Sequence, residues 1–513
     1  MNACFVRPIG RINRTCAPSA LWHWVARQFK VDFRKAKASV YRLQMRIAKA
    51  ARQKCYNKVK ALQWLLSHSF YAKLLAVHKV VSNKGHKTPG IDGVLWITEA
   101  DKAAAVLQLK RRGYQSQPLR RILIPKSNGK KRPLGIPTLK DRAMQALHHL
   151  GLNPVAEVWA DINSYGFRNK RSCQDALQQC FIVLSKKLSP RFILDADIKG
   201  CFDHIDHDWL LENIPMDRQM LEQWLKCGFI DGSVFNKTEE GTPQGGIISA
   251  TLCNMALDGL EAVVRQAVPS KGSRVNFIRY ADDFVITAKE EVLLTDNILP
   301  AVKAFLAQRG LTLSTEKTHI TTIDQGFDFL GCTVRKYHDK LLITPRQSKV
   351  LTFANTLKTL INKGVALPTH ALIGQLNRKL RGWFHYYRAV VAKETFAYID
   401  FIVYEALWRW MKRRHPKKSK HWCYKHYFKL QCTPGNTRRP IMAEQYVTAS
   451  GAIKWISLFK LGDLAIRRHI KIRAEANPFE SAYRKYFRKR WYSGKQRRRV
   501  DKNRLAKYQL VFP

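Results

Sequence analysis

Hydrophobic positions in the first part of the chain recur at the spacing of an amphipathic helix. Between residues 32 and 81, apolar side chains repeat every three or four positions, and Lys or Arg residues lie between them. The run TPGIDG over 88–93 then supplies a proline and two glycines, which end a helix. We therefore expect a basic helical extension over residues 1–85.

The pattern changes to short strands that alternate with helices over residues 86–340. The segment RRILIPKSNGKKRPLGIP predicts two strands around Asn128 and Gly129, a dipeptide typical of hairpin tips. Alternation of this kind favours an α+β fold with a mixed or antiparallel sheet. Beyond Pro345 the apolar spacing becomes predominantly helical, so we expect the clearest domain boundary near residues 335–345.

Composition indicates the size of the fold and the class of its partner. A chain of 513 residues is long enough for about three to four domains, and 46% hydrophobic residues exclude global disorder. The 90 Lys and Arg residues against 38 Asp and Glu residues give a net charge of +52, and the excess is densest after Leu341. Such a chain repels itself unless a polyanion neutralises it, and a phosphate backbone does so while releasing counterions. Nucleic acid is therefore the expected partner.

Cysteine usage and hydropathy indicate the compartment. The 11 cysteines include no C-x-x-C pair, so neither a disulfide framework nor a common zinc site is expected, and a reducing compartment is favoured. No apolar stretch reaches the roughly 18 residues that span a bilayer, so we expect no membrane partner. Arg7, Arg11 and Arg14 precede the first acidic residue, Asp32, as in an organellar transit peptide, but aromatic residues lead straight into the helical pattern. We expect a bacterial cytoplasmic, nucleoid-associated protein, with an organelle as the less favoured alternative.

Acidic residues occur where two strand-like segments end. In FIRYADDFVIT, two apolar runs flank Asp282 and Asp283, which would lie at a hairpin tip. In RFILDADIKGCFDHI, strand alternation puts Asp195 and Asp197 on one face. Carboxylates gathered in this way could hold two Mg²⁺ ions about 3.5–4 Å apart for an in-line phosphoryl transfer. An isolated Asp-Asp pair is more often a polar turn, so the interpretation depends on the segments around it.

The order and spacing of these segments resemble the fingers and palm of a reverse transcriptase. The closer resemblance is to the proteins encoded within group II introns, which join a reverse transcriptase to a maturase, and it covers roughly residues 32–490. The blocks that carry it are TPGIDG, IPKSNGKKRPLGIPTLKDR, SYGFRNKRSCQDA, LDADIKGCFDHIDH, GTPQGGIISATLCN, IRYADDFVI, LSTEKT and FDFLGC.

This resemblance implies an α+β, right-hand polymerase that follows the basic extension. Fingers and palm would occupy residues 86–340, an α-helical thumb or maturase domain residues 341–432, and a basic DNA-binding-like region residues 433–513. The implied enzyme is an RNA-directed DNA polymerase, a nucleotidyltransferase that uses Mg²⁺ and dNTPs to extend a DNA primer on an RNA template. It would bind its own group II intron RNA, assist splicing, and copy the intron into cDNA at a target DNA during retrohoming.

The resemblance also assigns residues to the polymerase site. The metal-binding triad comprises Asp197, Asp282 and Asp283. Five further residues would surround the incoming nucleotide: Lys126, Arg132, Phe202, Gln244 and Gly245. The two basic residues match contacts to the triphosphate, the phenylalanine matches the ring that excludes a ribose 2′-hydroxyl, and the last two match the loop beside the nascent base pair.

Two acidic residues beside the triad receive other roles. Asp195 shares a strand face with Asp197, and a supporting or structural role is favoured for it over direct contact with a metal. Asp203 is expected to cap or anchor the segment that follows it.

Residues 371–388, ALIGQLNRKLRGWFHYYR, predict a helix with two different faces. At 100° per residue, one face gathers a packing stripe: Leu372, Leu376, Leu380, Trp383 and Tyr387. The opposite face gathers four groups that are basic or can become so: Arg378, Arg381, His385 and Arg388. We expect RNA contact there, with a solvated surface as the alternative. Downstream segments such as RKYFRKRWYSGKQRRR mix Lys and Arg with aromatic residues, which suits phosphate contact and base stacking.

The carboxyl-terminal end departs from the resemblance. KIRAEANPFESAYRKYFRKR resembles the DNA-binding region that precedes an HNH endonuclease in many relatives, but no Cys or His follows Arg490, so we expect the nuclease to be missing.

Two other functions stay open: a similar polymerase in defence or DNA repair, or a splicing-only RNA-binding maturase with a decayed polymerase site. The intact DADIKGCFD, PQGG and YADD segments argue against decay.

Overall fold

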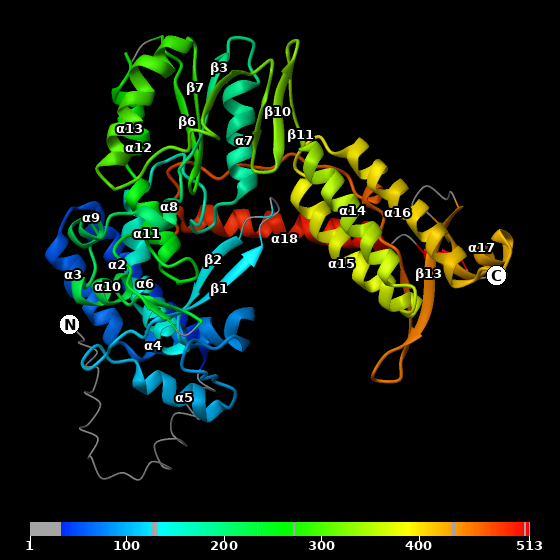
Figure 1. Ribbon diagram of the computed structural model, residues 1–513, viewed down its shortest axis with the longest axis horizontal. Coiled ribbons are helices and arrows are strands. Elements are labelled where there is room, and N and C mark those ends of the chain that lie inside the picture. The colour runs from blue at the N-terminus through cyan, green and yellow to red at the C-terminus, as the bar shows by residue number, and fades with distance from the viewer. Residues whose placement is uncertain are drawn as a thin grey trace.

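The computed structural model describes residues 32–125, 129, 131–232, 234–269, 272–432, 438–506 and 509–511 (Figure 1). Three sequence features lie outside these residues: the arginine-rich stretch before Asp32, the expected hairpin residue Asn128, and the nucleotide-binding candidate Lys126.

Helices at the amino-terminal end pack around one long helix. They are α2 (Phe33–Arg52), α3 (Tyr56–His68), α4 (Phe70–Val81), the 3₁₀ turn η1 (Lys84–Lys87) and α5 (Glu99–Gln108), and the long helix is α6 (Leu139–Trp159). Each of α2, α3 and α4 buries one apolar face in a core shared with α6. The basic amphipathic helices predicted over residues 32–81 are therefore confirmed.

The predicted hairpin forms, and it belongs to a four-stranded sheet. β1 (Leu119–Pro125) pairs antiparallel with β2 (Lys131–Ile136). β4 (Phe229–Asp231) joins the other edge of β1 in parallel, and β5 (Val234–Asn236) pairs with β4, which gives the order β2-β1-β4-β5.

The acidic motifs lie on a second sheet, called here the central sheet, which is antiparallel throughout and has the order β6-β7-β3-β8. Its strands are β3 (Phe192–Asp197), β6 (Asn276–Tyr280), β7 (Asp283–Ala288) and β8 (His319–Thr322). Leu194 and Phe284 belong to the core shared with α6, whereas Ile193 and Val285 belong to the core shared with α7 (Cys173–Leu184). Because both faces are buried, a one-residue slip would exchange the two sets of side chains, so the register is fixed.

Short helices lie between the strands of the central sheet along the chain, and some of them pack beside the sheet, to the left in Figure 1. They are α8 (Cys201–His204), α9 (His207–Asn213), α10 (Arg218–Leu225), α11 (Ser249–Leu257), α12 (Leu260–Gln266), the π-helix η2 (Leu293–Ile298) and α13 (Leu299–Ala307).

A three-stranded sheet leads from the central sheet to three long helices. The strands are β9 (Phe327–Phe329), β10 (Cys332–Tyr337) and β11 (Lys340–Pro345), and the helices are α14 (Gln347–Lys363), α15 (Thr369–Tyr387) and α16 (Lys393–Arg414). The helices extend to the right of the sheets in Figure 1, and their apolar faces meet in the core that also contains α7.

The helical pattern expected beyond Pro345 is wrong for residues 428–457, which form strands after α17 (Lys420–Tyr427). The sheet has the order β14-β13-β12-β15, with β12 (Phe428–Cys432), β13 (Arg438–Val447), β14 (Ile453–Ser457) and β15 (Gln509–Val511). Ile441, Met442 and Ala443 are consecutive and all buried. Periodicity cannot assign so short an apolar run to helix or strand, and pairing with β12 decides it.

The carboxyl-terminal segment returns to the rest of the fold instead of extending away from it. It contains the 3₁₀ turns η3 (Leu461–Asp463) and η4 (Ser481–Tyr483) and the long helix α18 (Arg484–Ala506), drawn in red in Figure 1. Arg490 Nη2 lies 3.1 Å from Asp175 Oδ1 at the start of α7. Among the helices in the described residues, none combines the length and the apolar character needed to cross a membrane.

Candidate active site

The three triad candidates lie at the same end of the central sheet. Tyr280 pairs with Asp283 across β6 and β7, so Ala281 and Asp282 form a two-residue turn and the predicted hairpin is confirmed. Asp197 ends β3 and lies directly opposite Asp283 in the register of β3 with β7. The fold therefore brings together two motifs that lie far apart in the sequence.

These carboxylates are electrostatically crowded. Burial, a hydrogen bond with Asp197 and the charges of Asp282 and Asp197 together raise the pKa of Asp283 to about 7. Burial also raises the pKa of Asp282, and the charge of Asp197 acts in the same direction. A nearby cation would let all three groups ionise, and carboxylate oxygens are the ligands that hard divalent cations prefer. The donor chemistry therefore fits a divalent metal ion.

Lys317, the lysine of the LSTEKT segment, supplies one positive charge to this site. Its Nζ lies 2.5 Å from Asp197 Oδ2, and its side chain is 65% exposed. The hydrogen bond and the charge of Asp197 raise the pKa of the lysine. LSTEKT belongs to the blocks identified in the sequence, but the partner of Lys317 is 120 residues away, so the contact could not be read from spacing.

A cavity of about 750 Å³ opens beside the triad. Asp195, Asp197 and Asp283 line it together with His319, whose Nε2 lies 3.9 Å from Asp195 Oδ2. Burial raises the pKa of Asp195 to about 6. Within the described part of the chain, no group of three or more His, Cys, Asp and Glu side chains is arranged to hold a metal ion.

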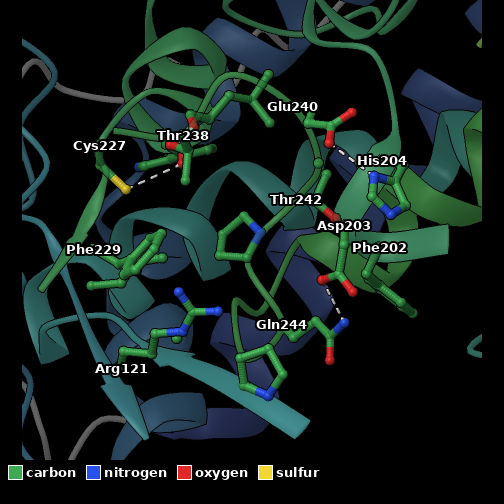
Figure 2. A pocket seen from close by; sticks show the side chains of 17 residues that line it. Arg121, Phe202, Asp203, His204, Cys227, Phe229, Thr238, Glu240, Thr242 and Gln244 are labelled. Carbon is green, nitrogen blue, oxygen red and sulfur yellow. Dashed lines mark hydrogen bonds and ion pairs between the residues drawn. The ribbon is translucent and has the colours of Figure 1, made fainter. Parts of the chain in front are cut away.

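The nucleotide-binding candidates that the structure describes lie next to one another beside α8. Gln244 donates from Nε2 to Asp203 Oδ1 at 2.7 Å, and its Oε1 accepts from Arg132 Nε at 2.5 Å. Gln244 thus joins β2 to α8, next to Phe202. Figure 2 shows the contact between Gln244 and Asp203 at the edge of a cavity of about 410 Å³ that Phe202 and Gln244 both line. Asp203 therefore anchors the loop that contains Gln244, as well as lying in α8 itself.

Gly245 has a backbone conformation that explains the glycine. Its φ of +133° is rare for residues with a side chain. A Cβ atom there would lie 2.4 Å from the carbonyl oxygen of Gly135. Gly135 N also donates to the carbonyl oxygen of Gln244 at 2.9 Å, so a backbone hydrogen bond ties the loop to β2.

Helix α15 has the two faces predicted for it. The packing stripe is buried at Leu372, Leu376, Leu380 and Tyr387 and half-buried at Trp383. On the opposite face Arg378, Arg381 and His385 are exposed, whereas Arg388 is half-buried and its Nη1 lies 2.7 Å from Asp501 Oδ2 in α18.

Three family models match the chain. They are "Reverse transcriptase (RNA-dependent DNA polymerase)" over residues 124–334, "N-terminal domain of reverse transcriptase" over 29–109, and "Group II intron, maturase-specific domain" over 350–428. Protein YkfC of Escherichia coli K12 is 31% identical over 345 residues, which cover 58% of this chain and 90% of the relative. The group II intron-encoded protein LtrA of Lactococcus lactis is 30% identical over 422 residues, which cover 63% of this chain and 69% of the relative.

The chain belongs to the group II intron reverse transcriptase/maturase family. A protein in the cob intron of Schizosaccharomyces pombe is also similar, at 27% identity over 425 residues that cover 66% of this chain and 52% of the relative. The expected fold class, an α+β reverse transcriptase followed by a helical region, and the expected RNA-directed DNA polymerase activity are confirmed. Members of this family generally use a divalent metal, and their partners include RNA.

Proposed function

We propose that this chain binds its own group II intron RNA, assists the splicing of that RNA, and copies it into cDNA at a target DNA. The observation that carries the proposal is that Asp197 lies directly opposite Asp283 in a chain whose residues 350–428 match a maturase-specific domain. dNTPs would be the substrates, and an RNA template paired with a DNA primer would occupy the active site. A bacterial cytoplasm and association with the nucleoid are consistent with these partners.

Asp197, Asp282 and Asp283 are the proposed ligands of two Mg²⁺ ions. When bound, the ions would activate the primer 3′-hydroxyl and stabilise the charge that develops on the departing pyrophosphate. The support is that burial and the neighbouring carboxylates raise the pKa of Asp282 and Asp283, and a cation would offset both effects.

The incoming nucleotide is proposed to lie between the triad and α8. Arg132 is exposed on β2 and would contact the triphosphate together with Lys126, which lies outside the described residues. The ring of Phe202 would exclude the ribose 2′-hydroxyl, and Gln244 and Gly245 would support the nascent base pair. The support is the hydrogen-bonded chain from Arg132 through Gln244 to the residue after Phe202.

The nucleic-acid surfaces are proposed to follow the domain divisions at residues 1–85, 86–340, 341–432 and 433–513. Arg378, Arg381 and His385 on α15 are exposed and would contact intron RNA. The basic helix α18 would bind the phosphates of the target DNA.

The test separates the two activities in one variant. Asp282→Ala should abolish cDNA synthesis on a primed RNA template while the protein still promotes splicing of the intron RNA, because RNA binding uses the basic surfaces. Asp296→Ala, an exposed carboxylate in η2, is the matched control and should retain both activities. Measurable cDNA synthesis by Asp282→Ala would contradict the assignment of the triad. Loss of splicing by the same variant would contradict the separate RNA surface.

A further inference from the structure

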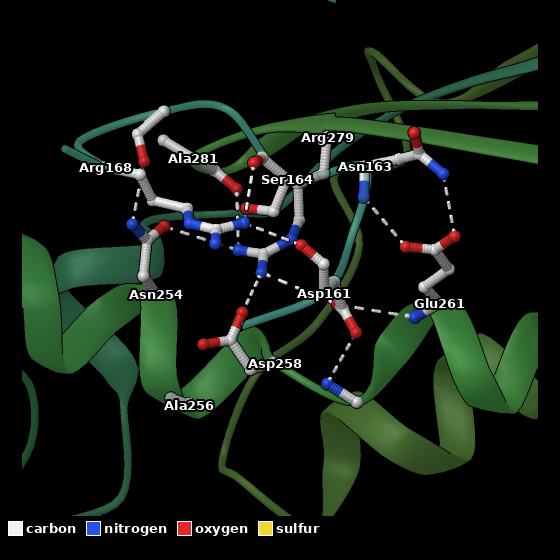
Figure 3. Close-up of polar contacts among 12 residues, drawn as sticks. Asp161, Asn163, Ser164, Arg168, Asn254, Ala256, Asp258, Glu261, Arg279 and Ala281 are labelled. Atoms are coloured by element: carbon white, nitrogen blue, oxygen red, sulfur yellow. Dashed lines mark hydrogen bonds and ion pairs between the residues drawn. The ribbon is translucent and has the colours of Figure 1, made fainter. Parts of the chain in front are cut away.

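Arg279 is a fully buried arginine directly beneath the turn that carries Asp282. Its side chain is 0% exposed, and its Nη2 lies 2.5 Å from Asp258 Oδ1 and 3.6 Å from Asp161 Oδ2. Figure 3 shows its guanidinium between these two carboxylates, with Asn254 and Ala281 on its other side. Burial raises the pKa of Asp258 to about 6, and the charge of Arg279 opposes that rise. Arg279 therefore contacts two buried acids at once, and no local sequence pattern singles it out.

The turn above Arg279 has a conformation that needs support. Ala281 has a φ of +59°, a left-handed conformation that side-chain-bearing residues rarely adopt. Arg279 Nη1 makes a long contact of 3.5 Å with the carbonyl oxygen of Ala281 and another of 3.4 Å with Asn254 Oδ1. The guanidinium thus holds the turn from below.

A neighbouring loop supports the same turn from the side. Gly166 packs so closely that a Cβ there would lie 2.4 Å from the amide nitrogen of Ala281. Asn254 Nδ2 donates to the carbonyl oxygen of Gly166 at 2.8 Å. The backbone of Arg279 also exchanges hydrogen bonds with this loop, accepting from Tyr165 N at 2.9 Å and donating to the carbonyl oxygen of Asn163 at 3.0 Å.

The partners of Arg279 connect the turn to the nucleotide side of the site. Asn254 lies in α11, and Asp258 caps its end. Helix α11 begins three residues after Gly246, so it directly follows the loop that contains Gln244 and Gly245. Arg279 is therefore in contact with the carboxylate turn and with the helix that follows the nucleotide loop.

We propose that Arg279 is a positioning residue that holds the turn Ala281–Asp282 in the conformation that presents Asp282 and Asp283 opposite Asp197. The proposal rests on the metal-binding role proposed for these carboxylates. An arginine is required because its planar group reaches Asp258, Asn254 and the carbonyl oxygen of Ala281 at the same time. A lysine keeps the charge beside Asp258 but has one donor group, so it cannot hold the turn as well.

The first test measures the turn itself. Arg279→Lys should fold, and hydrogen exchange of the amides in the peptide 277–287 should become about tenfold faster, because local opening of the turn becomes easier. In primer extension, the Mg²⁺ concentration at half-maximal rate should rise several-fold and kcat should fall, whereas KM for dNTP should change by less than about twofold. Asp258→Asn removes the counter-charge by an isosteric change and should shift the same quantities in the same direction. If Arg279→Lys does not fold, Asp258→Asn serves as the test in its place.

Asp400→Asn in α16 is the matched control. Asp400 is a half-buried carboxylate that accepts from the backbone amides of Leu461 and Gly462 and makes no contact with the turn or with Arg279 among the described hydrogen bonds. Its replacement should lower the melting temperature without changing exchange in 277–287 or the Mg²⁺ midpoint. If Arg279→Lys and Asp258→Asn behave like Asp400→Asn, Arg279 is only a core ion pair and the proposal is wrong. If exchange in the turn accelerates while the Mg²⁺ midpoint stays unchanged, Arg279 positions the turn but Asp282 and Asp283 are not the metal ligands.

Discussion

Arg388 at the end of α15 and Asp501 in α18 form an ion pair, with 2.7 Å between Nη1 and Oδ2, although 113 residues separate them. Arg467 Nη2 lies 3.2 Å from the other carboxylate oxygen of Asp501, so one acid pairs with two arginines. The side chain of Asp501 is only 10% exposed. Breaking such a pair is costly because the charge that remains stays shielded from water.

Asp501→Asn should therefore destabilise the protein and release α18. We expect the free energy of unfolding to fall by about 2–3 kcal/mol, as measured by urea denaturation, because two shielded guanidinium groups lose their counter-charge. Limited proteolysis should then cut within residues 484–506 sooner than in the parent protein. Asp324→Asn breaks an exposed pair with Arg191 and should change the same free energy by less than about 0.5 kcal/mol. Equal effects of the two changes would contradict this role of Asp501.

The salt dependence of RNA binding should distinguish the arginines of α15. Arg378 and Arg381 are exposed, so contacts with phosphates there release counterions. Replacing both by Gln should reduce the slope of log affinity against log salt by about 1.5–2, and should impair splicing before it impairs copying of a short primed template. Arg388→Gln should leave the slope almost unchanged because Asp501 already matches that charge. Filter binding of intron RNA over a salt series measures these slopes. A reduction of the slope by Arg388→Gln as large as that by Arg381→Gln would count against the prediction.

The ring of Phe202 should control selection of the sugar. Phe202→Ala removes the bulk proposed to exclude the 2′-hydroxyl, so discrimination against ribonucleotides should fall by at least about tenfold. Single-nucleotide incorporation with dNTP and rNTP measures the ratio of the two kcat/KM values. Tyr337→Ala, an exposed aromatic residue on β10, should leave this ratio unchanged. Unaltered discrimination by Phe202→Ala would show that another group performs the selection.

Stability should depend on pH and Mg²⁺ together. The pKa of Asp283 in the fold is about 7, above its ordinary value of about 3.9. A raised carboxyl pKa contributes stability that is complete below pH 3.9 and is lost as the pH rises through 7. Without metal the melting temperature should therefore decline between pH 5 and pH 8, and added Mg²⁺ should raise it more at pH 8 than at pH 6. Asp283→Asn should remove this difference, and thermal melts of both proteins at the two pH values test it.

The site could be predicted from sequence wherever its residues are adjacent in the chain. The hairpin at Asp282 and Asp283 follows from apolar runs on both sides, and the two faces of α15 follow from a period of 3.6 residues. Lys317, Asp501 and Arg279 escaped prediction for a different reason. Each is an ordinary basic or acidic residue whose role comes from a partner many positions away, and only the folded chain brings the partners together.

The strands at 428–457 show a second limit. Strand and helix were equally compatible with the short apolar run in β13, and its pairing partners decide between them. β15 shows the same effect in stronger form, because it joins this sheet from residues 509–511. The hydrophobic pattern of a short segment carries no information about which distant strand it will pair with.

The contacts of α18 also set an order of events during synthesis. Arg490 meets Asp175 across 315 positions of the sequence, and Asp501 meets Arg388 across 113. Contacts between such distant positions close large loops and form late in folding. While a ribosome is still adding α18, the start of α7 and the end of α15 are already made but lack these partners. The nascent polymerase therefore exposes the Arg388 guanidinium to other anions, and the Asp175 carboxylate to other cations, before its own carboxyl-terminal helix closes both sites.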